Sequence, residues 1–366
     1  MKGMKKGVVF CLALLLILST SACKKNEKPK EETKKVTKVE NQTEEHEELP
    51  EVTTPSNQNP LTGLPDLSEG AIGKRPVAVM INNHEAALPQ YGIAQADIMY
   101  EIPVEGDISR MMAIYGDYTT VPKICPVRSC RAYFPSFALG YDAFYVHWGS
   151  DDTIWDYLLS LNLDMYDGMS NAGGLFGRDE NRLAAGYSLE HTGYFDGTGF
   201  ASLVASEGKR TDLSEALQGK TAFQFYGLDE QVKPQGQDCR QIHINFGATT
   251  TDFSYDEASK TYLKSVYGTP QMDGNTNTQL AYTNVFILET EISVRDEEGH
   301  KDVNWRGGKD HVGYYISNGA VQKIHWEKAQ DERSQLKFYD ESGKEIQVNR
   351  GKSYIAVNYA GQSTFS

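Results

Sequence analysis

From residue 76 onward, the apolar residues of the chain fall in short runs separated by turn-forming residues. Short runs of this kind favour strands over long helices, and the 33 Gly and 21 Tyr among 366 residues point the same way. In the first half, the strand candidates are 76–81, 97–102, 111–115 and 143–147. Helix candidates at 127–139 and at 151–161, the latter capped by Ser150, alternate with these strands and predict a sheet covered by helices.

The second half, from Ile242 on, contains strand signals without helical patterns. The strand candidates are 253–256, 261–264, 285–288, 312–316, 321–326, 337–339 and 353–357. Turn-forming residues at 317–319 and 341–344 mark tight hairpins. The sequence therefore predicts an α+β fold, with an N-terminal mixed α/β domain followed by a C-terminal antiparallel β domain.

The N-terminus has the features of an export signal. Lys2, Lys5 and Lys6 precede an uninterrupted apolar run, Val8–Leu18. As a helix, this run would span only ~16 Å, against the ~30 Å of a bilayer core. It therefore predicts the core of a signal peptide and not a membrane span.

The signal ends in small residues followed by Cys23. This arrangement resembles the lipobox of bacterial lipoproteins, in which the cysteine is acylated and becomes the new N-terminus. Acyl chains such as palmitate on Cys23 would anchor the mature protein to the extracytoplasmic face of the cell membrane. The alternative is an ordinary secretory peptide cut near Ala22, which would leave a soluble protein.

Residues 24–60 contain no Phe, Trp or Tyr, but seven Lys, nine Glu and four Pro. Such a composition predicts a disordered linker, because it cannot bury enough apolar surface to fold. The predicted organisation is a signal peptide (1–22), a lipid-anchored linker (23–60), an N-terminal α/β domain (61–235) and a C-terminal β-rich domain (241–362).

The chain is acidic, with 50 Asp and Glu against 36 Lys and Arg and a net charge of −14. A nucleic-acid partner is not expected, because binding to phosphates requires a basic face. The folded part carries the negative excess, so an anionic membrane surface would repel it, and lipid headgroups are not its expected ligand.

Three cysteines follow Cys23, namely Cys125, Cys130 and Cys239. An odd number in an exported protein implies at least one free thiol or an intermolecular bond. A disulfide between Cys125 and Cys130 remains open, while catalysis by a thiol is not expected. The spacing fits no zinc site, and neither a metal nor a cofactor is predicted.

The densest group of candidate binding residues is the segment 125–131. Pro126 suits the first turn of a helix, which would place Arg128 and Arg131 on one face with Ser129 beside them. Two guanidinium groups and the free amides of a helix N-terminus would form a cradle for a carboxylate or phosphate. The alternative is that both arginines pair with local carboxylates such as Glu101 and Glu105.

Two further groups could support catalysis. Glu101 and Glu105 lie near Arg110 at a strand end, where they could act as acid and base or simply pair with arginines. His147 ends a strand candidate, and His191 follows later in the chain. There is no Gly-x-Ser-x-Gly elbow, so a hydrolase is only an alternative interpretation.

Taken together, these motifs resemble the YerB-like bacterial lipoproteins, which have an N-terminal and a separate C-terminal domain of unknown function. The resemblance rests on these segments: 59–63, 75–83, 89–90, 96–98, 101–106, 126–129, 253–256, 284–285, 318–319 and 326–328. It implies an envelope location and a plan of two domains, and it implies no activity.

We therefore expect a membrane-anchored extracytoplasmic lipoprotein that binds an anionic envelope component through an arginine-rich helix N-terminus. The candidate ligand-binding residues are Arg128, Ser129, Arg131, Arg110, Glu101, Glu105, His147 and His191. The expected partners are the bilayer, through acylated Cys23, and a cell-wall polymer or envelope protein. The sequence leans away from an enzyme; the alternatives are a hydrolase or transferase acting on cell-wall polymers, or an envelope adaptor protein.

Overall fold

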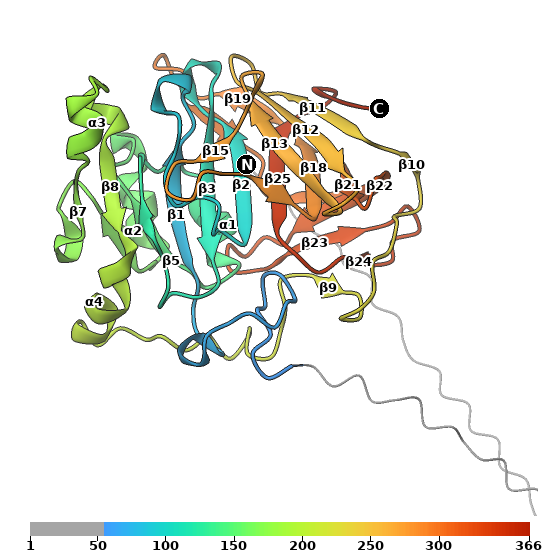
Figure 1. Cartoon of the computed structure of the whole chain (residues 1–366), viewed down its shortest axis with the longest axis horizontal. Coiled ribbons are helices and arrows are strands. Elements are labelled where there is room, and N and C mark those ends of the chain that lie inside the picture. Colours follow the sequence, from blue (N-terminus) through green and yellow to red (C-terminus); the bar gives the residue numbers. More distant parts are fainter. Residues whose placement is uncertain (1–54) are drawn as a thin grey trace, which may run out of the picture. The chain divides into compact units, whose positions relative to one another are not determined.

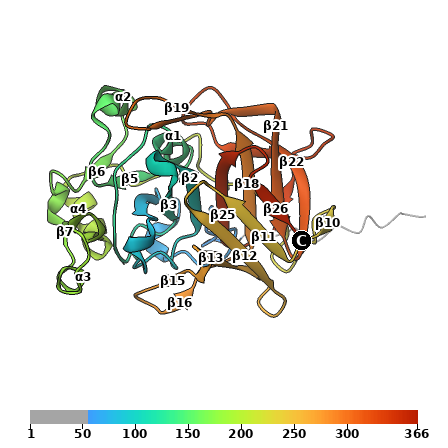
Figure 2. The same cartoon turned by 90° about the horizontal axis from the view of Figure 1, so that it is seen from above.

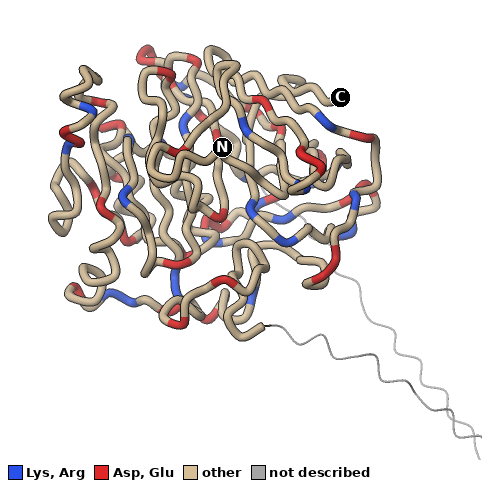
Figure 3. Tube along the Cα trace, in the orientation of Figure 1, with Lys and Arg blue, Asp and Glu red and all other residues tan. Residues whose placement is uncertain are grey.

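The structure is a computed structural model that describes residues 55–366 (Figure 1). The predicted signal peptide, Cys23 and the linker as far as residue 54 lie outside the described residues. Within 55–366, no helix is both long and apolar enough to cross a membrane. Acidic and basic positions are interspersed along the chain (Figure 3).

One sheet of eleven strands runs through the whole described molecule (Figures 1 and 2). Its strands, in spatial order, are β10 (Gln237–Asp238), β22 (Ala320–Lys328), β21 (Gly307–Ser317), β18 (Asn284–Thr290), β25 (Ser353–Tyr359), β2 (Ile98–Pro103), β3 (Ser109–Tyr115), β1 (Val77–Asn82), β5 (Phe144–His147) and β6 (Met165–Asp167), with β23 (Leu336–Tyr339) paired to β22. The apolar runs that predicted strands all fall on observed strands, and the predicted α+β class is confirmed.

The two halves of the chain meet inside this sheet. Strand β25, close to the C-terminus, pairs in parallel with β18 on one side and with β2 on the other. Its residue Ala356 lies opposite Glu101 of β2. The C-terminal strands pair mostly antiparallel, as predicted, but β25 departs from that pattern and joins both halves into one continuous sheet.

A second sheet packs against one face of the C-terminal part. It consists of β14 (Thr269–Pro270), β13 (Thr261–Val266), β12 (Thr250–Asp256), β11 (Gln241–Asn245) and β26 (Ser363–Phe365), with β17 (Ala281–Tyr282) paired to β13. Phe253 of this sheet packs on Tyr354 of β25, with ring centroids 4.9 Å apart. The C-terminal half is therefore a sandwich of two sheets around a shared apolar core.

The helices are few and short. They are α1 (Phe134–Leu139), α2 (Trp155–Ser160), α3 (Glu180–Ala184) and α4 (Phe200–Ser206). Phe134 and Phe137 of α1 and Leu158 of α2 are buried in the core on one face of the main sheet. Phe200 and Val204 of α4 belong to the core on its opposite face. The helices thus cover the N-terminal half of the sheet on both sides.

Small pairings of strands complete the fold. They are β4 (Lys123–Ile124) with β8 (Gly193–Asp196) and β7 (Phe176–Arg178), the hairpins β15 (Met272–Asp273) with β16 (Thr278–Gln279) and β19 (Ile292–Val294) with β20 (Lys301–Val303), and β9 (Gln224–Phe225) with β24 (Gln347–Val348). In the last pair, residues 224–225 lie beside residues 347–348 and add another link between the two halves.

The predicted helix over 127–139 is wrong in its first half. Val127 forms an isolated bridge with Ile81, and the Arg128 amide donates to the Met80 carbonyl (3.0 Å). The carbonyl of Arg128 accepts from the Trp148 amide (3.0 Å). Because neighbouring strands already satisfy this backbone, the segment is extended, and no helix N-terminus forms at the arginines. The second helix candidate forms a 3-10 turn, Asp152–Ile154, followed by α2; Asp151, and not Ser150, caps this turn by accepting from the Thr153 amide.

All three cysteines in the described residues are buried and free, so the disulfide between Cys125 and Cys130 does not form. Burial raises the pKa of Cys125 and of Cys130 to about 12 and that of Cys239 to about 11. A thiol with such a pKa stays protonated near neutral pH and is a poor nucleophile.

Candidate functional site

The predicted ligand-binding residues do not share one cleft. Glu101 is fully buried at the junction of the two halves. Its Oε1 accepts from the side chains of Asn83 (3.1 Å), Ser109 (2.6 Å) and Thr251 (3.0 Å). Such a carboxylate has no access to an outside molecule, and its contacts indicate a structural role.

The second carboxylate oxygen of Glu101 faces the C-terminal half. It accepts from the Tyr354 hydroxyl (2.8 Å) and lies 3.1 Å from the Lys264 ammonium. Burial lowers the pKa of Lys264, and the charge of Glu101 opposes that shift. The pair therefore joins the second sheet to strand β2 across the buried interior.

Arg110 and Arg131 form a second buried cluster around Glu105. Arg131 contacts Glu105 through two nitrogens, with Nε 2.8 Å from Oε2, and Arg110 Nη2 donates to Oε1 (3.0 Å). Burial alone would raise the pKa of Glu105, but the charges of Arg110 and Arg131 lower it well below its usual value. For Arg131, pairing with a local carboxylate is thus what the structure shows.

Both histidines are buried in separate places. Burial lowers the pKa of His147, and its Nδ1–H donates to the Gly149 carbonyl (2.9 Å). His191 accepts at Nδ1 from the Asn82 amide (3.0 Å) and stacks on His84 at 5.4 Å between ring centroids. Neither histidine lines any of the five cavities described in residues 55–366.

Arg128 and Ser129 lie on a surface groove of about 560 Å³. The groove is lined by Val127, Arg128, Ser129, Trp148, Gly149, Ser150, Asp152, Trp155, Asp167, Met169, Arg178, Leu189 and Glu190. It lies beyond the carboxyl ends of β5 and β6, which run parallel to each other. Ligands of sheets with parallel strands commonly bind at this edge, because the loops there carry polar groups that are not used in hydrogen bonds between strands.

Trp148 forms an aromatic wall of the groove. Its indole is held between two backbones, since a Cβ on Gly168 would approach it to 2.5 Å and a Cβ on Gly193 to 2.8 Å. The Arg178 guanidinium stacks over the ring at 4.2 Å from its centroid. The positions of Trp148 and Arg178 are therefore mutually fixed before any ligand arrives.

The guanidinium groups of Arg128 and Arg178 both line the groove, as do the exposed acids Asp152 and Glu190. Arg128 Nη2 donates to Glu190 Oε2 (2.7 Å), and 51% of the Glu190 side chain is exposed. Arg178 Nη1 donates to the Leu189 carbonyl (2.7 Å). Burial and the neighbouring charge of Arg128 lower the pKa of Arg178. The arginine pair of this site is thus Arg128 with Arg178, and not Arg128 with Arg131.

Exposed apolar side chains border the same groove. Trp155, Met169 and Leu189 are 41%, 71% and 59% exposed. Asp167 turns inward, since its Oδ1 accepts from the Gly149 and Met169 amides (2.8 and 2.9 Å). A ligand with an anionic group beside an apolar surface would match this lining.

A separate cluster, Asp151, Asp296 and His300, has the spacing of metal ligands. Arg295 already bonds to both carboxylates, to Asp151 and to Asp296 (3.3 Å). His300 Nδ1 lies 2.8 Å from Asp296. With a guanidinium among the acids, the group is an ion-pair network that ties the 295–300 loop to the cap of the turn Asp152–Ile154, just before α2.

The chain matches the "Protein of unknown function (DUF3048) N-terminal domain" over residues 61–211 and the corresponding C-terminal domain over 242–355. It belongs to this two-domain family. It is 29% identical over 304 residues to the "Putative lipoprotein YerB" of Bacillus subtilis (strain 168), covering 81% of this chain and 85% of that protein. The crystal structure of YerB from Bacillus subtilis superposes with a TM-score of 0.71 at 26% identity, covering 84% of this chain and 98% of the other.

The resemblance to YerB-like proteins is thus confirmed, and the structure shows where several of its motifs lie. Asn83 and Gln90 belong to the network around Glu101, because Gln90 donates to Asn83 Oδ1 (3.2 Å). Gln271 of the C-terminal half donates to both, at 3.3 Å to Asn83 and 3.1 Å to Gln90. In this DUF3048 protein, these motif residues connect the two halves.

Sequence reasoning missed Trp155, Asp167 and Arg178 as groove residues. Arg178 is distant in sequence from Arg128, and their proximity depends on the pairing of β7 with β8. The available signal was the segment after His147, where Trp148 and Ser150 follow a strand end directly. A polar or aromatic segment after a strand of a parallel pair is a common place for binding residues.

Proposed function

We propose that this protein is a lipoprotein, anchored to the extracytoplasmic face of the cell membrane through acylated Cys23, whose Arg128 groove binds an anionic envelope component. The likeness to a lipoprotein of Bacillus subtilis supports the anchored location. The Lys-rich start, the apolar run and Cys23 of this chain agree with it. The anionic ligand would be a carboxylate of cell-wall peptides or a phosphate of an envelope polymer.

The observation that carries the proposal is the pair Arg128 and Arg178. Arg178 bonds to a backbone carbonyl, and the one acid that contacts Arg128 is the exposed Glu190. An exposed ion pair contributes little to stability, so an incoming anion can displace Glu190 at small cost. Binding would also relieve the repulsion between the two guanidinium groups. A bidentate carboxylate or phosphate suits such a pair better than a point charge would.

Tryptophan fluorescence gives a direct test. Trp148 and Trp155 line the groove, whereas Trp305 and Trp326 are buried elsewhere. The full-length protein in detergent would be titrated with glycerol phosphate and, separately, with a short dipeptide carboxylate. We expect a saturable change with one or both probes, weakened by added salt because charge attraction is screened.

Three variants sharpen the test. Arg128→Gln should weaken anion binding by about tenfold, the loss expected for one charge-assisted contact. Glu190→Gln should strengthen it several-fold, because it removes the competing acid. Arg240→Gln is the matched control, since Arg240 also pairs with an exposed acid, Glu257 (2.8 Å), but does not line the groove. Equal affinities in all three variants, or no saturable change with either probe, would contradict the proposal.

A further inference from the structure

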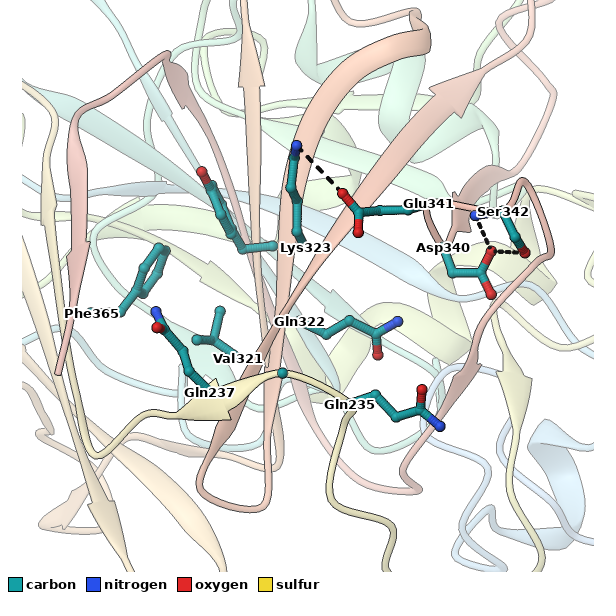
Figure 4. A pocket seen from close by; sticks show the side chains of 11 residues that line it. Gln235, Gln237, Val321, Gln322, Lys323, Asp340, Glu341, Ser342 and Phe365 are labelled. Atoms are coloured by element: carbon teal, nitrogen blue, oxygen red, sulfur yellow. Dashed lines mark hydrogen bonds and ion pairs between the residues drawn. The ribbon is translucent and has the colours of Figure 1, made fainter.

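A second cavity, of about 500 Å³, lies in the C-terminal half at the end of the main sheet (Figure 4). The cavity lies along one edge of β22, because β10 pairs there with residues 320–321 and β23 pairs only from His325 onward. The volume is within the ~300–1,000 Å³ that is usual for small-ligand sites. This cavity is separate from the Arg128 groove and shares none of its lining residues.

Three carboxamide side chains line this cavity, from Gln235, Gln237 and Gln322. Among the described residues, none of the three amides has a hydrogen-bond partner within the protein, so their donors and acceptors are directed to solvent. Each amide offers two N–H donors and one carbonyl acceptor. Together they form a dense, uncharged array of both donors and acceptors.

An aromatic surface stands beside the amides. Tyr314 of β21 and Phe365 of β26 pack together with centroids 4.8 Å apart and an interplanar angle of 52°. Figure 4 shows the Gln237 amide next to Phe365, with Gln322 on the other side of Val321. The cavity therefore combines ring faces with hydrogen-bonding groups at their edge.

The tight turn at residues 340–342 also lines the cavity. Asp340 Oδ1 accepts from the amide (2.9 Å) and the hydroxyl (2.6 Å) of Ser342. Lys323 lies 3.6 Å from Glu341, and both side chains are largely exposed. One cation therefore faces two acids, and the lining has no cationic excess that could hold a phosphate or carboxylate.

The way β10 approaches β22 also fixes the cavity. A Cβ on Gly236 would lie 1.9 Å from the Val321 carbonyl, so only glycine allows the segment to lie so close to β22. Gln235 and Gln237, the two neighbours of Gly236, both line the cavity. Their placement is thus set by backbone packing and not by a flexible loop.

We propose that this cavity binds a sugar unit of a neutral glycan. A sugar ring has C–H groups on its faces and hydroxyl groups around its edge, each of which both donates and accepts. Tyr314 and Phe365 match the faces, and the amides of Gln237 and Gln322 match the edge. An acetamido substituent would find the same amides as partners. This assignment is independent of the anion groove and does not rest on the function proposed above.

The test uses the full-length protein in detergent with two neutral probes, chitotriose and maltotriose, followed by saturation-transfer NMR. Binding of chitotriose alone would show that the acetamido groups are recognised, and binding of maltotriose would show that hydroxyl groups suffice. Either result supports the glycan site. No saturable transfer with either probe at millimolar concentration would overturn it.

The variants Gln237→Ala and Phe365→Leu should each weaken binding by about tenfold, since each removes one of the two kinds of contact. Gln237 is exposed, so its replacement should leave the fold intact. Arg128→Gln is the control and should bind the sugar normally. Sugar binding that both cavity variants leave unchanged, or that inorganic phosphate displaces, would also overturn the proposal.

Discussion

The Lys264 ammonium lies 3.1 Å from the Glu101 carboxylate, and neither side chain is exposed to solvent. Glu101 belongs to the N-terminal half and Lys264 to the second sheet. We expect Glu101→Gln and Lys264→Met each to lower the free energy of unfolding by about 3–5 kcal/mol, because each leaves one buried charge without its partner.

The double variant of Glu101 and Lys264 should lose less than the sum of the two single losses, because it contains no unpaired charge. Urea unfolding followed by circular dichroism measures all four proteins. Strictly additive losses would show that the two groups do not interact in solution.

The continuous sheet leads to a second prediction, about the independence of the two halves. Strand β25 supplies the neighbour of β2, and residues 347–348 pair with 224–225. We expect the fragment 241–366 to remain unfolded alone, because it would expose one edge of β25 and the buried Lys264. Mixing it with a fragment of residues 55–240 should restore the far-ultraviolet spectrum. A cooperative thermal transition of 241–366 alone would show two independent domains.

The third prediction concerns Arg128 and Arg131, which the sequence analysis placed together in one binding site. Arg131→Gln should lower the free energy of unfolding by about 2–3 kcal/mol, because Arg131 is buried and holds Glu105. Arg128→Gln should change it by less than about 1 kcal/mol, because its ion pair is exposed. Thermal unfolding of both variants beside the wild type checks this contrast, and comparable losses would contradict it.

The fourth prediction concerns pH. Burial raises the pKa of Asp97 from its usual 3.8 to about 6. The hydrogen bond that Asp97 accepts from the Gly116 amide (2.7 Å) and the charge of Lys352 lower this pKa, but by less than burial raises it. The folded state thus holds a proton that the unfolded chain loses between about pH 4 and 6. Stability contributed by this group is therefore present at low pH and lost as the pH rises through about 6, by about 3 kcal/mol in total.

Replacing this group should remove that dependence. Relative to Asp97→Asn, the wild type should become less stable as the pH rises from 4 to 7, as measured by urea unfolding at each pH. Asp212→Asn, which changes an exposed acid, is the control and should follow the wild type. A constant difference between wild type and Asp97→Asn across this range would show that Asp97 does not titrate in it.

Much of the sheet could be predicted because its strands are short apolar runs. All residues of β1, β2 and β3 are buried. Strands that are buried on both faces are mostly apolar along their length, and such runs can be recognised in the sequence. The helix over 127–139 failed because its first residues contact β1 and Trp148, which local sequence does not reveal. Pro126 before Arg128 gave a good helix-start signal, and tertiary pairing overrode it.

The site was predicted only in part for a similar reason. Arg128 and Ser129 were identified from their own segment, and both do line a groove. Arg178 and Trp155 come from other elements and meet them only after folding. The pairing of Arg131 with Glu105 was foreseen as an alternative, but the depth at which it is buried depends on packing that spacing cannot indicate.

Strand β25 has a consequence for the order of assembly. If the chain is exported as proposed, its N-terminal half crosses the membrane before its C-terminal half, yet the neighbour of β2 comes from residues 353–359. Until these last residues arrive, β2 has an open edge that can pair with another polypeptide. The exported chain must therefore complete its passage before its central sheet can close, and any delay or truncation near the C-terminus would favour misassembly at the cell surface.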